Sequence, residues 1–407
     1  MQSKPRADEV DIAVVGGGIT GLLAACALST TPHRVACVAP DERRQDGRTT
    51  ALLADAIADL RALDAWDACE PHAAPLRTMR LLDGTSRLLR SRPLDFNAGE
   101  IGLTAFGYNV PNEALLVALR RSSERAGVVH RAAHVAGVDA TTGRLTLSDG
   151  SVLHARLLVA ADGRNSMLRA AAGIRTRSWT YDQVAFVLTF RHDEPHAGVS
   201  TELHTESGPF TQVPLPAEAD APHRSSLVWV VRTDEAGEIE GLSTSEMERV
   251  IEKRFERAWG AVAIEREPQR FPLAGQVAVA MGRDRTALVG EAGHVFPPIG
   301  AQGANLGFRD VRDLVRLLRS HGPDVVAAPY SRARAGDVGL RTAGVDLLNR
   351  SLLTDLLPVQ VGRFAATEAI VRSGPLRRAM MRSGLAPSSA RQGEGNGSAG
   401  RTPAVMT

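Results

Sequence analysis

The chain has 407 residues, of which 43% are hydrophobic and 23% are charged. These values are close to ordinary globular usage and exclude a mainly disordered, collagen-like or coiled-coil protein. The length predicts about two to three domains. Lysine and arginine total 48 against 46 acidic residues, a formal net charge of +2. So small a net charge gives little support for a nucleic-acid partner, and we expect none.

Three features of the sequence bear on compartment and chemistry. Cys26, Cys37 and Cys69 show no CxxC spacing, so we expect no disulfide framework, no metal site and a reducing, cytoplasmic location. Residues 12–28 superficially resemble a signal peptide, but acidic residues precede the run and glycines interrupt it. The sequence contains no HExxH, Walker or GxSxG pattern, so the usual signatures of hydrolases and phosphate-transfer enzymes are missing.

The N-terminal elements predict a βαβ unit. Residues 10–15 have the composition of a buried strand, glycines and an apolar helix through Leu28 follow, and residues 34–39 form the next strand. This order begins a parallel sheet. Further on, Asn112 is expected to cap a helix, and Asp149-Gly150 is expected to turn a β-hairpin.

The middle of the chain changes character and the end becomes helical. Residues 184–232 predict strands separated by loops rich in Pro, Gly and acids, which indicates a second, sheet-rich domain. A strand at 286–290 then returns to the first domain and leads into a helix. Residues 341–383 predict helices broken near Pro358 and Pro375, and the sequence from Pro387 is typical of a disordered tail.

The first motif is Gly16-Gly17-Gly18-Ile19-Thr20-Gly21, a GxGxxG between a strand and a helix. Glycines allow the backbone to approach a pyrophosphate, whose charge is met by the helix N-terminus. The alternative is a tight turn without a ligand. A carboxylate about 20 residues on should hold a ribose, but the second strand ends at Ala39. Asp41, or backbone groups and water, would then take its place.

Two more motifs follow strands. The second runs from Leu157 to Ser166 and places Asp162-Gly163 at a strand end, where a simple turn is the alternative explanation. The third runs from Ala287 to Gly307 and places Glu291 at a strand end, before a Pro/Gly loop and a helix. The N-terminus of that helix suits a ligand that gains negative charge. His294 has two interpretations, a general base or a packing histidine with a satisfied hydrogen bond, and we favour the second.

These motifs, in this order, resemble the FAD-dependent aromatic hydroxylases of the para-hydroxybenzoate hydroxylase class. Within that class the chain is most similar to the ubiquinone-biosynthesis flavin hydroxylases. The segments that carry the narrower resemblance are Asp46–Leu52, which matches D-x-R-x-x-A-L, Gly107–Asn112, Trp179–Gln183 and Leu347–Pro387. The similarity covers roughly residues 10–387. This chain departs from the usual pattern of the family at three positions. It has Ala39, Glu291 and Ala301 where the family usually has Glu, Asp and Gly.

The resemblance implies FAD as cofactor and a set of residues that bind it. The implied cofactor-binding residues are Gly16, Gly18, Gly21, Arg48, Asp162, Gly163, Glu291, Gly303, Ala304 and Asn305. Pro298 would lie near the flavin ring, and no catalytic side chain is assigned, because the flavin carries the chemistry. NAD(P)H is the implied electron donor. Oxygen would then form a flavin hydroperoxide that hydroxylates a prenylated phenol.

The expected fold is α/β, and α+β overall, in five segments. They are a Rossmann-like FAD-binding domain whose first part is 8–183, a sheet-rich substrate domain at 184–275, the return of the FAD-binding domain at 276–340, a helical C-terminal region at 341–386 and a disordered tail at 387–407. The helices of 341–383 pair apolar residues with arginines. They either pack as a C-terminal subdomain or rest peripherally on a membrane, and other quinone-biosynthesis proteins are further candidate partners.

Two alternatives to the hydroxylase remain at this point. A flavin reductase or dehydrogenase can use the same fold, since fold does not fix chemistry. A non-catalytic accessory protein of the quinone pathway would retain the fold without turnover, and the departures at Ala39 and Glu291 are its sequence support.

Overall fold

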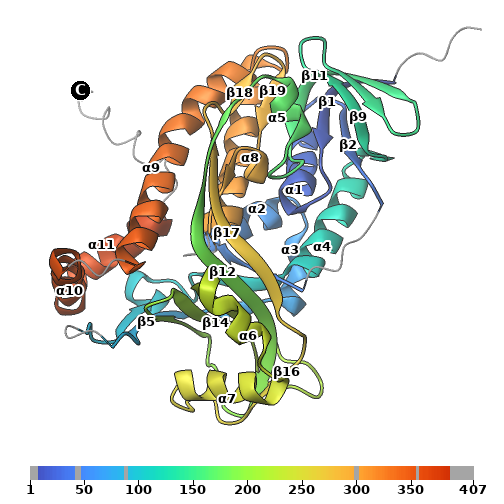
Figure 1. The fold of residues 1–407 in the computed structure, drawn as a ribbon. Helices are drawn as coiled ribbons and strands as arrows, with labels where there is room; N and C mark the ends of the chain where they lie inside the picture. The colour runs from blue at the N-terminus through green and yellow to red at the C-terminus, as the bar shows by residue number, and fades with distance from the viewer. Residues whose placement is uncertain (1–7, 42–46, 87–89, 298–301, 354–356, 386–407) are drawn as a thin grey trace, which may run out of the picture.

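The computed structural model describes residues 8–41, 47–86, 90–297, 302–353 and 357–385. Over these residues the chain combines helices with three β-sheets, and the last helices lie at one side of the molecule (Figure 1). The predicted α/β class, with a helical C-terminal region, is confirmed. The predicted tail at 387–407 lies outside the described residues.

The first sheet has β1 at its centre. Its described strands are β1 (Asp8–Val15), β2 (Val35–Ala39), β8 (Val129–Ala132), β9 (Val135–Asp139), β10 (Arg144–Leu147), β11 (Val152–Ala160), β18 (Gly282–Arg283) and β19 (Thr286–Leu288). The main order is β18-β19-β11-β1-β2-β8, and β1 pairs in parallel with both β2 and β11. The chain leaves β1 for β2 on one side and later returns to β11 on the other. A crevice for a ligand therefore opens at the carboxyl end of β1.

Helices pack around this sheet and complete the main core. They are α1 (Ile19–Ser29), α2 (Ala54–Ala62), α3 (Trp66–Cys69), α4 (Asn112–Arg125), α5 (Met167–Ala171) and α8 (Gln302–His321). α1 contacts α4 and α8, and its Leu and Ala side chains are buried almost all round, which explains its uniformly apolar sequence. In α8 the sequence has apolar residues at helical spacing, of which Val311, Leu314 and Leu318 are buried in the same core and Val315 is partly buried against it.

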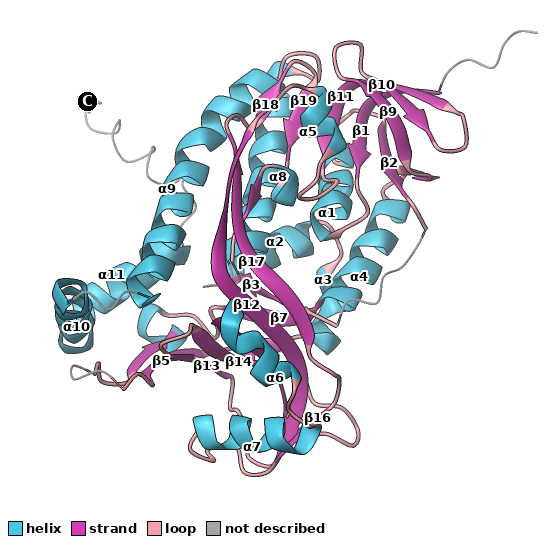
Figure 2. Ribbon diagram, viewed as in Figure 1, coloured by secondary structure: helices cyan, strands magenta, loops and turns pink. Residues whose placement is uncertain are grey.

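The second sheet collects strands from several parts of the sequence. Its described strands are β5 (Thr78–Asp83), β6 (Leu94–Asn97), β12 (Thr176–His192), β13 (Val199–His204), β14 (Pro209–Leu215), β15 (Arg224–Arg232), β16 (Val262–Ile264), β17 (Gln269–Ala278) and β20 (His294–Val295). The long strands β12 and β17 cross the expected boundaries at 183/184 and 275/276 (Figure 2). β5 and β6 fall within the expected first segment, 8–183, but pair in this sheet.

One face of the second sheet is covered by α6 (Ala236–Glu240) and α7 (Thr244–Arg254). Phe186, Phe190 and Trp229 from the strands pack with Ile251 of α7 in that cluster. A smaller apolar cluster of Ala185, Val230 and Leu273 lies apart from it. Because neighbouring strand residues point to opposite faces, Ala185 belongs to the face away from Phe186 and α7.

A third, small sheet and the remaining helices complete the fold. The small sheet contains β3 (Thr49–Leu53), β7 (Gly107–Pro111) and β4 (Ala74–Leu76), and short 3-10 turns are η1 (Glu70–His72), η2 (Ala98–Ile101), η3 (Thr233–Glu235) and η4 (Gly290–Ala292). The C-terminal helices are α9 (Ala327–Leu353), α10 (Leu357–Arg372) and α11 (Gly374–Leu385). New helices therefore begin near Pro358 and Pro375, where the sequence predicts breaks. None of the described helices is long and apolar enough to cross a bilayer.

Candidate functional site

The three motifs meet at the carboxyl end of β1. A Cβ on Gly16 would lie 2.1 Å from the carbonyl oxygen of Ala161, so the first and second motifs touch through their backbones. A Cβ on Gly290 or on Gly307 would lie 2.9 Å from Thr20 Oγ1, which brings the third motif against the start of α1. Segments almost 300 residues apart in the chain thus form one site.

The glycines of the first motif have different surroundings. Gly16 has a φ of +126°, and a Cβ on Gly21 would lie 2.0 Å from the carbonyl oxygen of Gly16. Both positions therefore need glycine for the fold itself. A Cβ on Gly18 would meet no heavy atom within 4 Å. Gly18 therefore presents open space directly before α1, where a phosphate can approach the helix N-terminus.

The second motif presents a partly unsatisfied carboxylate. Asp162 Oδ2 accepts hydrogen bonds from the backbone N–H groups of Met167 (2.7 Å) and Leu168 (3.2 Å) at the start of α5. Asp162 Oδ1 is buried and has no hydrogen-bond partner among the described residues. Gly163 follows with a φ of +82°, which only glycine adopts readily. A ligand hydroxyl would satisfy the free oxygen of Asp162.

The third motif presents Glu291 on η4. Its side chain is exposed and has no hydrogen-bond partner among the described residues. Gly303 is exposed in the first turn of α8, and Ala304 is half-buried beside it. Pro298 and the neighbouring residues through 301 lie outside the described residues. Glu291 and the start of α8 thus leave a carboxylate and backbone N–H groups available to a ligand.

The amide of Asn305 is largely engaged within the protein. Its Nδ2 donates to the carbonyl oxygen of Ala51 (2.8 Å), and its Oδ1 accepts from the backbone N–H of Leu53 (2.9 Å). The side chain of Asn305 therefore fixes β3 to the start of α8. Any contact of Asn305 with a cofactor falls to its backbone.

His294 is a packing residue, as the favoured interpretation has it. The ring is 1% exposed, and its Nε2–H donates a hydrogen bond to Asp310 Oδ2 (2.6 Å), while Nδ1 is buried with no hydrogen-bond partner among the described residues. Phe296 stacks on the ring with a centroid distance of 5.4 Å. This enclosed position leaves His294 no access to a substrate.

The sequence also singled out Arg48, Ala39 and Asp41. The guanidinium carbon of Arg48 lies 5.2 Å from the ring centroid of Phe271 on β17, so Arg48 joins the small sheet to the second sheet by a cation–π contact. Phe271 pairs directly with Ala185 and therefore shares its face. A Cβ on Gly17 would lie 2.8 Å from the Cβ of Ala39, so the end of β2 contacts the first motif. Asp41, two residues further on, is exposed.

Sequence patterns did not identify the residues that hold the motifs together. Arg169 donates from Nη1 to the carbonyl oxygen of Ala292 (2.8 Å) and from Nη2 to that of Arg164 (2.9 Å). Gln276 Nε2 also donates to the carbonyl oxygen of Arg164 (3.0 Å). The only signal for Arg169 is its place in the short helix that follows Asp162-Gly163. In an arginine-rich chain that signal is weak.

Together these features fit FAD. The open space at Gly18 suits a pyrophosphate, and the unpartnered oxygens of Asp162 and Glu291 suit ribose or ribityl hydroxyls. The described part of the chain holds no cluster of His, Cys, Asp or Glu that could bind a metal.

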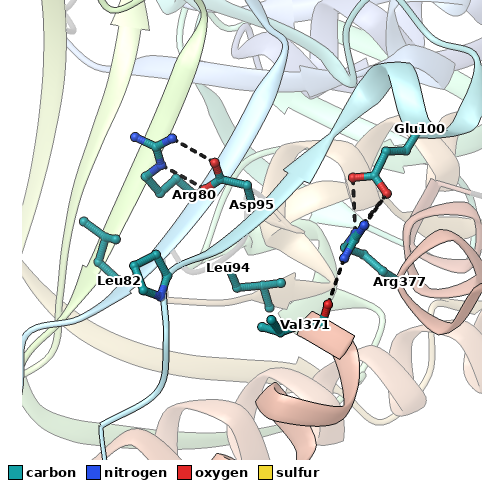
Figure 3. A pocket seen from close by; sticks show the side chains of 8 residues that line it. Arg80, Leu82, Leu94, Asp95, Glu100, Val371 and Arg377 are labelled. Atoms are coloured by element: carbon teal, nitrogen blue, oxygen red, sulfur yellow. Dashed lines mark hydrogen bonds and ion pairs between the residues drawn. The ribbon is translucent and has the colours of Figure 1, made fainter. Parts of the chain in front are cut away.

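A separate cavity of about 570 Å³ lies between β5–β6 and the C-terminal helices (Figure 3). Its charged groups are paired, since Arg80 makes two hydrogen bonds to Asp95 and Arg377 binds Glu100. No residue of the three motifs lines it. This cavity is therefore distinct from the dinucleotide site.

Comparisons with known proteins agree with this geometry. A family model described as "FAD binding domain" matches residues 9–324. The ubiquinone hydroxylase UbiL of Rhodospirillum rubrum is 34% identical over 92% of this chain and 90% of that protein. The 3-demethoxyubiquinol 3-hydroxylase of Escherichia coli is 28% identical over 92% of this chain and 98% of that protein.

Solved structures share the fold. The p-nitrophenol 4-monooxygenase PnpA of Pseudomonas putida superposes with a TM-score of 0.74 at 17% identity, over 92% of this chain and 98% of that one. PqsL of Pseudomonas aeruginosa, in complex with 2-aminobenzoylacetate, also gives 0.74 at 21% identity, over 89% and 100%. The resemblance drawn from the sequence motifs is confirmed: the chain belongs to the FAD-binding domain family, and its cofactor is FAD.

Proposed function

We propose that this protein is an FAD-dependent monooxygenase that hydroxylates the aromatic ring of a prenylated phenol in ubiquinone biosynthesis. The observation that carries the proposal is the convergence of Gly18, Asp162 and Glu291 on one crevice. Relatives named as ubiquinone hydroxylases, similar over nearly the whole chain, support the reaction class. The substrates are then a small phenol and O2.

Each part of the site has a separate task in holding the cofactor. Gly18 and the N-terminus of α1 would bind the pyrophosphate, and Asp162 and Glu291 would accept hydrogen bonds from sugar-like hydroxyls. The N–H groups at Gly303, Ala304 and Asn305 would face negative charge on the reduced ring. When bound, FAD supplies electron transfer from a reduced donor, which we take to be NAD(P)H, and transfer of one oxygen atom from O2.

The second sheet would provide the wall of the substrate site. The face opposite α6 and α7 carries Ala185, Val230 and Leu273, with half-buried Tyr181 and Val228 beside them. Arg48 and Phe271 border the same face. An apolar wall of this kind suits an aromatic ring with a prenyl chain and excludes water from the reaction.

The surface of α11 supports a peripheral membrane contact. Leu376 and Met380 are 43% and 42% exposed and lie one helical turn apart. Arg378 and Arg382 flank them, while Arg377 is paired with Glu100. Exposed apolar side chains beside arginines suit an anionic bilayer. Sedimentation with anionic and neutral vesicles tests this, and an L376Q/M380Q variant that sediments like the wild type contradicts it.

The function is tested by turnover with isotopically labelled dioxygen. Purified protein is loaded with FAD and incubated with NAD(P)H and a phenol that carries a short prenyl chain. Mass spectrometry should find one labelled oxygen atom in the product. A product reduced at a double bond without O2 would indicate a reductase, and protein that cannot bind FAD would indicate an accessory role.

A further inference from the structure

Three buried charged or titratable side chains form a group, one from the third motif and one each from α8 and α9. Asp310 of α8 is 0% exposed, and His294 and Arg334 of α9 are each 1% exposed. None of these residues reaches the open space before α1 or the exposed carboxylate of Glu291. Such a group is costly to bury unless its hydrogen bonds are satisfied. Both oxygens of Asp310 are bonded, whereas His294 Nδ1 and Arg334 Nη2 have no hydrogen-bond partner among the described residues.

The carboxylate of Asp310 holds both ends of the turn that carries Glu291. Its Oδ2 accepts from the backbone N–H of Gly290 (2.9 Å) and from His294 Nε2 (2.6 Å). Gly290 has a φ of +59°, which glycine adopts readily, and a Cβ here would lie 2.9 Å from Thr20 Oγ1. One oxygen atom thus closes the five-residue turn 290–294 and fixes the direction in which Glu291 leaves it.

Arg334 in turn orients the carboxylate. Its Nε donates to Asp310 Oδ1 (2.8 Å), and its Nη1 donates to Asp337 Oδ2 (2.8 Å) and Asp313 Oδ2 (3.1 Å). The planar guanidinium of Arg334 therefore binds the carboxylate of Asp310 and those of Asp313 and Asp337 at the same time. A group fixed by several charge-assisted hydrogen bonds has little freedom to rotate.

We infer that Arg334 and Asp310 are positioning residues for the FAD site. They set the turn 290–294 relative to the first turn of α8, because Asp310 lies on the same helix as Gly303 and Ala304. The inference rests on FAD as the cofactor of the proposed function. Supporting groups behind a binding residue determine how closely that residue keeps its productive geometry.

The test compares FAD affinity with stability in matched variants. R334M removes the charge at similar length, and D310N keeps the shape of the carboxylate. Both apoproteins are titrated with FAD by flavin fluorescence, and the visible circular dichroism of the bound flavin is recorded. We expect the dissociation constant to rise at least about tenfold in each, with an altered flavin spectrum. R334K, which keeps the charge, should recover part of the affinity.

A control variant separates positioning from the general loss of an ion pair that is partly buried, with side chains 14% and 17% exposed. Arg224 of β15 makes two hydrogen bonds to Glu265, at 2.7 and 2.9 Å, away from the three motifs. R224M should lower the urea midpoint without changing FAD affinity or the flavin spectrum. The inference is overturned if R334M and D310N also lower only the midpoint. If R334M does not fold, D310N and R334K decide the outcome.

The two proposals fail in different ways. Wild-type protein that binds FAD but hydroxylates no phenol would overturn the proposed function and leave this inference intact. Conversely, full hydroxylation by the wild type, with unchanged FAD affinity in D310N and R334K, would overturn the inference alone.

Discussion

Arg169 on α5 and Ala292 in the third motif are joined by a hydrogen bond of 2.8 Å from Nη1 to the carbonyl oxygen, although 123 residues separate them. The same guanidinium binds the carbonyl oxygen of Arg164 through Nη2. Arg169 is 9% exposed, and burial lowers the pKa of its guanidinium. One side chain thus fastens the turn after Asp162 to the turn that carries Glu291.

Replacing Arg169 should therefore affect stability and cofactor binding together. R169M leaves the carbonyl oxygen of Ala292 without its donor, at about 1–3 kcal/mol for a buried group left unsatisfied. The carbonyl oxygen of Arg164 keeps its hydrogen bond from Gln276 Nε2. We expect a lower urea midpoint and weaker FAD binding, measured on the apoprotein by unfolding and by fluorescence titration. R120M, which removes an exposed arginine paired with Glu124, is the control and should change neither. An R169M variant that binds FAD like the wild type would contradict the role of this contact.

The first motif makes a prediction that separates binding from folding. In G18V the new side chain enters the open space before α1, so the protein should fold but lose bound FAD. In G21V the Cβ would lie 2.0 Å from the carbonyl oxygen of Gly16, so the fold itself should suffer. Circular dichroism and the flavin absorbance of the purified proteins measure both effects. Stoichiometric FAD in G18V would be evidence against the motif assignment.

Local patterns in the sequence were sufficient for β1, α1 and the apolar face of α8, because strand and helix periodicity act over a few residues. The pairing of strands from distant segments could not be predicted from such local patterns. β5 joins β13 in parallel, with Thr78 opposite Val199, and nothing in either segment specifies the other. The expected N-cap at Asn112 was also wrong, since Asn112 is the first helical residue and its Oδ1 accepts from Thr50 (2.6 Å).

The residues of the candidate site also differ in whether local sequence patterns identify them. Gly18 and Asp162 could be predicted because glycine and Asp-Gly turns have local sequence signatures. Arg169, Asp310 and Arg334 could not, because what distinguishes them is burial and partners contributed by other elements. In a chain with so many arginines, composition does not separate the buried ones from the solvated ones.

A histidine in the second sheet predicts sensitivity to acid. Burial lowers the pKa of His192 to about 4, and His196 and His223 nearby add to the effect. The folded state therefore favours the neutral ring, while in the unfolded chain the ring has the ordinary histidine pKa of 6.5. Above pH 6.5 this contribution to stability is fully present, and it is lost as the pH falls towards 4.

Urea unfolding at pH 7.5 and pH 5 measures this loss. The wild type should lose stability between the two conditions by up to about 1.4 kcal/mol per pH unit below the unfolded pKa, from this residue. H192Q keeps an amide for Ser225 Oγ, which lies 2.9 Å from His192 Nε2, and cannot titrate. Its pH dependence should be smaller, and an equal dependence in both proteins would exclude His192 as the source.

Glu291 offers the sharpest test of the cofactor site. It is exposed on η4 without a hydrogen-bond partner among the described residues, so its carboxylate is free to accept from a ribityl hydroxyl of FAD. A hydrogen bond to a charged group contributes about 1.5–3 kcal/mol, and about 1.4 kcal/mol corresponds to tenfold in affinity. E291A should therefore weaken FAD binding roughly ten- to a hundredfold. E291D keeps the charge and the acceptor and should weaken it much less. Titration of the three apoproteins with FAD distinguishes this role from that of a solvated surface carboxylate, for which all three dissociation constants would be equal.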